Sequence, residues 1–477
     1  MKTTTHGALS RLHKFAGVIV APFLIVAALS GFFYALAPTL EQWVYHDEIT
    51  ATAQGSPRSL DDQIAAAQRQ HPGAAVAAVE ASEDPEETTR VLFTDPDAKS
   101  PSYNHAVFVD PVDLRITGEE QQYGGSRALP LRTWLSNGHR TLWLGEPGRI
   151  YAELAASWLG ALTIAGVYLW LKRRKKTQKK NNKALRIHAR LGSWLLPGFL
   201  FLTITGLTWS MVAGSNIGKV REELNWKEPS VATSVAEAGA GAGGHAGHAG
   251  HAGHEGHEGH AGHSGGEAVD NDVLEGAQTA LSTARSEGLT GVLRMTPPEQ
   301  VGDAWTVREG RAAYKLRSDA VAVTADGRVI DRINSADWPL AARLTSWLIQ
   351  LHMGTLFGIY SQVALAALAL GLLVISIAGL WMWWNKPRRR LPELKITPAV
   401  VAGVVIYSII APLFGASLLL FFAGDWLVRR LRPQSRSRSR SRSGSQSGPG
   451  RSNGVSGPTA RPRGESSSRI PSTVQNG

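Results

Sequence analysis

Long apolar runs alternate with polar loops along the chain, and four of the runs can cross a bilayer, which takes about 20 residues. They cover Phe15–Pro38, Ile150–Leu171, Leu191–Ala213 and Tyr360–Trp384. Each is predicted to be a transmembrane helix. The tripeptide Ala35-Leu36-Ala37 resembles a signal-peptide cleavage site. The first run is longer than a signal core and its pattern recurs later, which favours a retained helix.

A fifth apolar run near Thr397–Val428 contains Pro412 and Gly415. If this run crosses the membrane once, the basic C-terminal tail lies outside, against the positive-inside rule. If the two residues mark a re-entrant turn, the tail stays in the cytoplasm. The pattern fits both topologies.

Basic clusters orient the first four helices, because lysine and arginine are enriched in cytoplasmic loops. The clusters are Lys2, Arg11 and Lys14 before the first helix, Lys172–Lys176 between the second and third, and Lys386–Arg390 after the fourth. All three then lie in the cytoplasm, and the two long loops, at about residues 39–149 and 214–350, lie outside.

Both outer loops show a small α+β pattern. The first predicts a helix at Leu60–Gln70, strands at Ala74–Val79, Arg90–Phe93 and Ala106–Val109, and a turn at Asp110-Pro111. The second predicts a helix near Asp272–Arg285, strands at Trp305–Arg308, Ala313–Leu316 and Ala320–Val323, and a turn at Ala325-Asp326-Gly327. Similar domains in matching places indicate a duplication.

Two histidines at cytoplasmic helix ends, His13 and His188, share their flanking residues. Both have Arg two before, Gly four after, Pro nine after, Gly eighteen after and an aromatic residue twenty-one after. These are Arg11, Gly17, Pro22, Gly31 and Tyr34 in the first copy and Arg186, Gly192, Pro197, Gly206 and Trp209 in the second.

Two histidines at outer helix ends, His139 and His352, repeat a second pattern. Both have Trp five before, Gly six after, Gly twenty-seven after and Trp thirty-one after. These are Trp134, Gly145, Gly166 and Trp170 in the first copy and Trp347, Gly358, Gly379 and Trp383 in the second. The chain is therefore two copies of one unit, helix, outer domain, helix.

Charge and cysteine content narrow the chemistry. The net charge is +11, but the segment from Arg430 onward holds ten Arg and one Glu, so the body is nearly neutral and offers no basic patch for nucleic acid. The run SRSRSRSRS at Ser435–Ser443 indicates a disordered tail that contacts anionic lipid. The absence of cysteine excludes disulfides, thiolate metal sites, cysteine-held iron–sulfur clusters and covalently attached haem.

The repeated histidines predict haem ligation. In a pseudo-two-fold four-helix bundle, His13 would face His188 and His139 would face His352, and two facing imidazoles can fill both axial positions of a b-type haem. A single histidine at a helix end is more often an interfacial polar residue, and duplication alone could copy an idle one. The presence of two histidine pairs at matching offsets favours haem ligation over these alternatives. Arg11, Arg186 and Arg140 are candidate partners for haem propionates, or equally ordinary interfacial anchors.

Other histidines carry weaker signals. Seven recur every third residue in a Gly-rich insert and could gather Cu, Ni or Zn ions on one face of an extended chain, or belong to low-complexity sequence without a role. They are His245, His248, His251, His254, His257, His260 and His263. His46, His71 and His105 lack a repeat partner among the four, so surface positions are expected.

The segments LHKFAGV, HRTLWLGEPGR, IHARLG and LHMGTLFG, with spans ending in TIAGVYLWLK and SIAGLWMWW, resemble the PepSY-associated transmembrane helix family. The resemblance covers about residues 5–390 and implies that the outer domains are PepSY modules. It also implies an inner-membrane di-haem protein with His13, His188, His139 and His352 as ligands, similar to ferric-siderophore reductases. The His-rich insert and the Arg-rich tail depart from the family pattern.

The predicted fold is a mainly α membrane protein. It has a pseudo-two-fold four-helix transmembrane bundle, a fifth C-terminal hydrophobic segment and two small α+β PepSY-like extracytoplasmic domains. The segments are 1–38, 131–176, 177–213 and 341–390 for the four helices, 39–130 and 268–340 for the outer domains, 214–267 for the linker with its insert, 391–429 for the fifth segment and 430–477 for the tail.

The predicted function is electron transfer through two haem b groups to a ferric siderophore or other oxidised metal complex in the periplasm. Because no nucleotide motif is present, a cytoplasmic reductase or membrane quinol would be the electron donor. The protein is expected to lie in a bacterial inner membrane and to contact its lipids. The alternative is a haem-free PepSY-type membrane protein that binds or senses peptides, peptidases or metal ions.

Overall fold

The computed structural model describes residues 5–98, 100–178, 182–234, 271–385 and 398–431. The chain divides into two compact units, residues 1–423 and 424–477. All elements below lie in the first unit except the end of the last helix. The seven histidines of the Gly-rich insert and most of the Arg-rich tail lie outside the described residues.

Three helices in the described part of the chain are long and apolar enough to cross a membrane. They are α1 (Thr5–Val44), α5 (Glu146–Gln178) and α12 (Ile359–Trp384). A fourth crossing is available if the bent pair α6 (Lys183–Trp194) and α7 (Leu196–Thr208) counts as one span. The multi-pass membrane protein expected from the hydropathy pattern is therefore confirmed.

The third predicted span, Leu191–Ala213, is not one straight helix. The axes of α6 and α7 differ by 64°, and the break lies at Leu195, two residues before Pro197. Proline has no N–H for the carbonyl one turn earlier, and its ring crowds that carbonyl. Pro22 holds the same repeat position, yet α1 continues through it. The duplicated proline thus bends only the second copy.

The long helices carry exposed apolar side chains, whose contact with water would be unfavourable. Leu29 and Phe33 on α1, Ile164 on α5 and Val363 on α12 are each between 46% and 57% exposed. A contiguous apolar surface of this kind is typical of contact with lipid. Trp194 and Trp384, at the ends of α6 and α12, are more than 80% exposed, as expected for tryptophans at the membrane interface.

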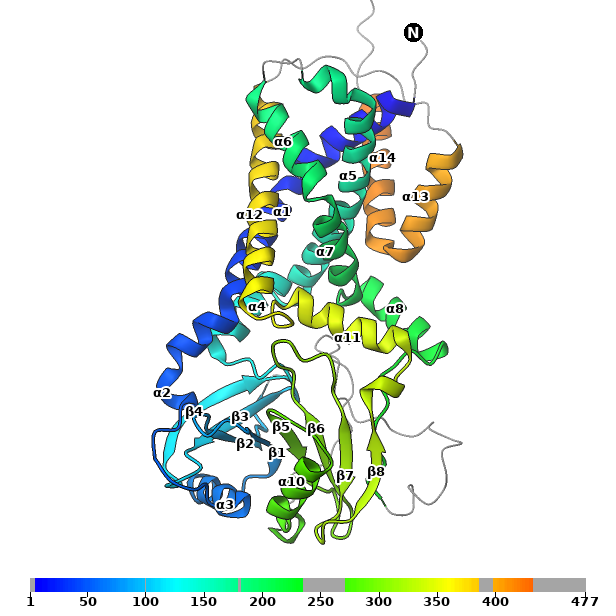
Figure 1. The fold of residues 1–477 in the computed structure, drawn as a ribbon. Helices are drawn as coiled ribbons and strands as arrows, with labels where there is room; N and C mark the ends of the chain where they lie inside the picture. The colour runs from blue at the N-terminus through cyan, green and yellow to red at the C-terminus, as the bar shows by residue number, and fades with distance from the viewer. Residues whose placement is uncertain (1–4, 99, 179–181, 235–270, 386–397, 432–477) are drawn as a thin grey trace, which may run out of the picture. The chain divides into compact units, whose positions relative to one another are not determined.

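The long helices also pack against one another. Contacts join α1 to α12 and α5, α5 to α7, and α12 to α6 (Figure 1). Their shared core contains Val20 and Leu24 from α1, Trp158 from α5 and Phe199 from α7. These contacts bring segments from both halves of the sequence together.

The outer histidines lie on short separate helices, which corrects the expectation that each stands on its transmembrane helix. His139 belongs to α4 (Pro130–Thr141) and His352 ends α11 (Leu340–His352). Short turns then lead into α5 and α12. Gly145 and Gly358 occupy these turns with φ of +67° and +52°, where a side chain would be strained. Their matching offsets therefore mark two equivalent turns.

The outer segments form one antiparallel sheet of eight strands. The strands are β1 (Val76–Ala81), β2 (Thr89–Thr94), β3 (Tyr103–Val109), β4 (Ile116–Tyr123), β5 (Leu293–Thr296), β6 (Trp305–Glu309), β7 (Ala320–Val323) and β8 (Val329–Ile333). Their order is β4-β3-β2-β1-β5-β6-β7-β8. Each half of the sequence supplies four neighbouring strands, and the halves join where β1 pairs with β5.

Helices α3 (Leu60–Gln70) and α10 (Ala277–Ser286) cover one face of this sheet. Leu60 and Ile64 of α3 and Ala280 of α10 pack in the same buried core as Phe93 and Trp305 of the strands. Both predicted outer helices are thus present, with α10 preceded by the short 3-10 helix η1 (Asn271–Leu274).

Most predicted strands exist, but Ala313–Leu316 is not one, and β4, β5 and β8 were not predicted. The sequence ITGEEQQY of β4 gives little apolar alternation because β4 is an edge strand with a half-exposed surface. Strand β8 occupies the opposite edge. Strands at sheet edges bury fewer side chains, so their hydropathy pattern is weak.

Five shorter helices complete the description, and two of them form the fifth apolar segment. They are α2 (His46–Ile49), α8 (Val212–Glu223), the 3-10 helix η2 (Ser335–Asp337), α13 (Pro398–Ile410) and α14 (Pro412–Leu431). The chain turns between α13 and α14 (Figure 1). The Ser408 side chain of α13 lies close to Gly415 of α14. The predicted break at Pro412 is present; the side of the membrane that holds the tail stays a prediction.

Glu153 on α5 connects two helices through a buried carboxylate. It is 2% exposed and accepts the backbone N–H groups of Val212 at 2.8 Å and Ala213 at 3.0 Å, at the start of α8. Replacing Glu153 by Ala should destabilise this helix start by about 1 kcal/mol, as for other lost N-caps. Faster hydrogen exchange at the α8 amides would show it, and the exposed Glu146→Ala should leave that exchange unchanged.

Candidate functional site

The inner histidines face each other across two helices from different halves of the chain. His13 lies on α1 and His188 on α6, and their ring centroids are 6.1 Å apart with an interplanar angle of 80°. Two imidazole nitrogens on opposite sides of one metal ion, each at a typical bond length, hold their ring centroids about 6 Å apart. The predicted inner pair is thus brought together at a ligating distance.

The outer histidines, His139 and His352, have similar surroundings. Each has an aromatic neighbour from the first helix of its own copy. Tyr34 is parallel to the His139 ring at 6.2 Å between centroids, and Trp209 meets the His352 ring edge-on at 5.2 Å. Tyr34 and Trp209 are the aromatic residues at the same repeat offset. This shared offset therefore marks equivalent positions beside the two outer imidazoles.

In both outer histidines, Nδ1 lies within hydrogen-bonding distance of a side-chain hydroxyl. Nδ1 of His139 lies 3.1 Å from Ser30 Oγ, and Nδ1 of His352 lies 2.6 Å from Thr205 Oγ1. Each hydroxyl donates its only proton to a backbone carbonyl one turn earlier, of Val26 or of Phe201. A hydroxyl that donates in this way accepts from Nδ1–H. This tautomer leaves the lone pair of each outer imidazole on Nε2.

The inner pair shows the same arrangement in one member. Nδ1 of His188 lies 3.0 Å from the carbonyl oxygen of Ile375, which can only accept, so Nε2 again holds the lone pair. Leu162 stands at the matching repeat position and interacts with His13. The Nδ1 atom of His13 is buried without a hydrogen bond of normal geometry among the described residues. Three of the four imidazoles therefore have an oxygen within hydrogen-bonding distance of Nδ1.

Glycines leave room beside three of the imidazole rings. A Cβ atom at Gly31 would lie 3.0 Å from Cε1 of His139, and one at Gly166 would lie 3.1 Å from Cε1 of His13. At Gly379 the distance to Cε1 of His188 would be 3.6 Å. Gly206, the fourth repeated glycine, is next to Thr205 in sequence. The glycines noted only as repeat markers thus permit close approach of helix and ring.

The two pairs are far apart along α1. Ser30, which contacts His139, stands 17 residues after His13 in one continuous helix. At 1.5 Å per residue the separation is about 25 Å, close to the roughly 30 Å thickness of a bilayer core. The inner and outer pairs therefore belong to opposite ends of the membrane-spanning region.

The predicted arginines are less clearly placed. Arg140 follows His139 and donates to Tyr123 Oη at 3.2 Å, with its guanidinium 5.7 Å from the Tyr123 ring. Arg186 is half-buried on α6. The Arg11 side chain lies outside the described residues. The propionate role of these arginines stays a prediction.

Ser30 and Thr205 are the site residues that the sequence analysis missed. Both stand seventeen residues after the first histidine of their copy, so a hydroxyl at the same offset was available as a signal. Ile375 could not have been found in this way, because its backbone carbonyl, not its side chain, meets His188.

Comparison with known proteins gives a family and no individual relative. No curated protein matches the chain. The profile of the family described as PepSY-associated TM region matches residues 10–386, a range that includes all four histidines and the whole sheet. The chain therefore belongs to the PepSY-associated TM region family.

Proposed function

We propose that this protein is a di-haem b electron-transfer protein of the bacterial inner membrane that reduces a ferric siderophore or similar oxidised metal complex on the periplasmic side. The observation that carries the proposal is the orientation of the imidazoles. Nδ1 of His139, His188 and His352 each lies within hydrogen-bonding distance of an oxygen that can accept its proton, an arrangement that would leave Nε2 for a metal ion. The 6.1 Å separation of His13 and His188 supports it independently.

The residues fit two haem groups with histidine on both sides. His13 and His188 would hold the inner group, and His139 and His352 the outer one. Glycines stand where larger residues would press on the rings of His13, His139 and His188. A haem held by two histidines would supply one-electron exchange.

The chain's own groups would hold these ligands and tune them. Acceptors on Nδ1–H would fix the ring planes of His139, His188 and His352 and raise the basicity of Nε2. Since the two pairs lie about 25 Å apart along α1, electrons would pass from the cytoplasmic to the outer half of the membrane. The donor would be a cytoplasmic reductase or quinol.

The outer domain contacts the segments that carry the outer pair, through β4 and through the loop between β6 and β7, which supports an acceptor at this face. Tyr123 of β4 accepts from Arg140, beside His139. Tyr314 donates its backbone N–H to Leu356 O at 2.7 Å, and Trp347 donates Nε1–H to Leu316 O at 2.8 Å. A metal complex bound near these contacts would lie next to the α4 and α11 helices.

Stopped-flow mixing tests the reductase activity. Protein reduced with dithionite should be reoxidised by ferric chelates, and His139→Ala should slow this step while the inner pair still takes up electrons. Cupric chelates in a parallel series would identify the metal preference. Failure of every ferric and cupric chelate to reoxidise the reduced protein would contradict the reductase assignment.

Removing the hydroxyl acceptor should change the properties of the outer haem. Thr205→Val deletes the partner of His352 Nδ1, and second-sphere losses of this kind typically weaken metal binding by about 10–100-fold. Weaker donation from Nε2 also destabilises the oxidised iron, so its reduction potential should rise. Thr203→Val is the matched control, because that buried hydroxyl donates only to Phe199 O. Potentiometric titration measures the shift.

A further inference from the structure

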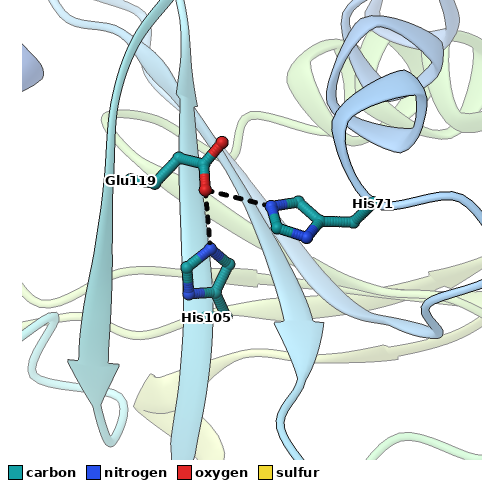
Figure 2. Close-up of side chains that lie close together, drawn as sticks. All are labelled: His71, His105 and Glu119. Carbon is teal, nitrogen blue, oxygen red and sulfur yellow. Dashed lines mark hydrogen bonds and ion pairs between the residues drawn. The ribbon is translucent and has the colours of Figure 1, made fainter.

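A second cluster of metal-ligating groups lies in the outer sheet. Nε2 of His71 and Nε2 of His105 are each 3.0 Å from the same Glu119 oxygen, Oε2 (Figure 2). One ligand atom from each residue lies within 4.8 Å of the other two. These histidines were expected at isolated surface positions, so their convergence was not predicted.

Three elements position these side chains. His105 on β3 and Glu119 on β4 belong to adjacent strands, with His105 paired to Gln121 and Glu119 to Val107. Glu119 stands two residues before Gln121, the partner of His105, so the side chains of His105 and Glu119 lie on the same face of the sheet. His71 caps the C-terminus of α3, whose Leu60 and Ile64 are packed in the core. The backbone of all three ligands is therefore anchored.

The spacing matches a transition-metal site. Donor atoms in a tetrahedral set with bonds of about 2.05 Å lie about 3.4 Å apart. The two histidine–carboxylate distances of 3.0 Å are already near this value. Small side-chain rotations would bring the third distance, between the two imidazole nitrogens, to a similar value. Two imidazoles and one carboxylate suit Zn²⁺, Cu²⁺ or Ni²⁺ better than Mg²⁺ or Ca²⁺, which favour all-oxygen sets.

The chemistry and exposure of the cluster favour exchange with solvent. The three side chains are 32%, 35% and 34% exposed, so an ion could enter without unfolding. The hydrogen bonds of His105 and His71 outweigh the opposing effect of partial burial and lower the pKa of Glu119. Its carboxylate is thus charged and aimed at both rings at neutral pH.

The fold itself does not require the cluster. The second half builds the corresponding edge with AVAV in β7 and VIDRI in β8, which contain no histidine. Its Asp331 instead accepts the backbone N–H of Ala232. The convergence of two imidazoles on a carboxylate thus belongs to the first copy alone.

We infer that His71, His105 and Glu119 bind one divalent transition-metal ion of the Zn²⁺/Cu²⁺ class, with the fourth position open to water or an exogenous ligand. None of these three residues is one of the four membrane histidines. The site does not depend on haem binding.

The test uses the full chain with the seven insert histidines replaced by Gln, which removes the competing ligands. Zn²⁺ titration by calorimetry gives affinity and stoichiometry, and electron paramagnetic resonance of added Cu²⁺ counts the coordinated imidazole nitrogens. One tight ion with two imidazole nitrogens is expected. His105→Gln should weaken Zn²⁺ binding by about 100-fold or more, since even second-sphere changes cost about 10–100-fold.

Two further variants control the result. His46→Gln alters an exposed histidine outside the cluster and should leave the Zn²⁺ affinity unchanged. Glu119→Gln keeps the size of the side chain and should also weaken binding, so the conclusion does not depend on one variant. The inference is wrong if His105→Gln and Glu119→Gln bind Zn²⁺ as the background chain does. Because each comparison is between variants, the answer holds whether the preparation contains haem or not.

Discussion

Replacing His13 by Ala is expected to halve the haem content of the purified protein, from two haems per chain to one. The centroid of its ring lies 6.1 Å from that of His188, so the variant leaves His188 without the opposite ligand. The outer pair is about 25 Å away along α1 and should keep its haem. Pyridine haemochrome analysis measures the content, and added imidazole should restore part of the loss by replacing the missing side chain.

Three companion variants make this result specific. His139→Ala should remove the other haem, and the double replacement of His13 and His139 should remove both. His46→Ala changes an exposed histidine on α2 and should keep two. A His13→Ala protein that retains two haems would contradict the assignment of the inner pair.

Replacing Glu80 by Ala should destabilise the sheet by about 3–5 kcal/mol, the usual cost of removing one partner from a buried ion pair. Glu80 is 1% exposed and accepts from Arg127 Nε at 3.0 Å and from an Arg294 guanidinium N–H at 2.7 Å. Arg294 lies on β5, so this bond joins the two halves of the sheet. Hydrogen exchange at the β1 and β5 amides should accelerate accordingly.

The effect of Glu80 should depend on pH. Burial raises the pKa of Glu80, but the positive charges of Arg127, Arg294 and Arg90 lower it by more. The pKa in the folded protein therefore lies below its ordinary value. The stabilisation is then fully present above the unfolded pKa, about 4.3, and is lost as pH falls through the folded pKa. The exchange difference between Glu80→Ala and the unchanged protein should therefore shrink in acid.

The exposed Glu86 provides the matched control for Glu80. Surface replacements away from such networks usually change stability by less than about 0.5 kcal/mol, so Glu86→Ala should exchange like the unchanged protein. Equal exchange in Glu80→Ala and Glu86→Ala would mean that the buried carboxylate does not hold the two halves together.

The repeat offsets predicted much of the site. They identified the four histidines, and the structure places Tyr34 and Trp209, residues at one shared offset, beside the two outer imidazoles. Gly145 and Gly358 proved to be positive-φ turns. Residues repeated at the same offset in both copies are informative because they occupy equivalent positions in equivalent helices and turns.

The repeat pattern did not predict features that differ between the two copies. Pro22 and Pro197 share an offset, but only the second marks a bend, since helix packing decides whether a proline is accommodated. The joining of the halves through β1 and β5 depends on backbone hydrogen bonds and on the Glu80–Arg294 ion pair, which connect residues far apart in the sequence and leave no trace in the local hydropathy pattern. The His71, His105 and Glu119 cluster has no counterpart among the described residues of the second copy, so the repeat did not reveal it.

The absorption spectrum of the protein purified from haem-replete cells tests the central claim most directly. The account predicts reduced b-type bands after dithionite, with a haem content of two per chain. A colourless protein from such cells would contradict it and would favour a haem-free role in binding or sensing peptides, peptidases or metal ions.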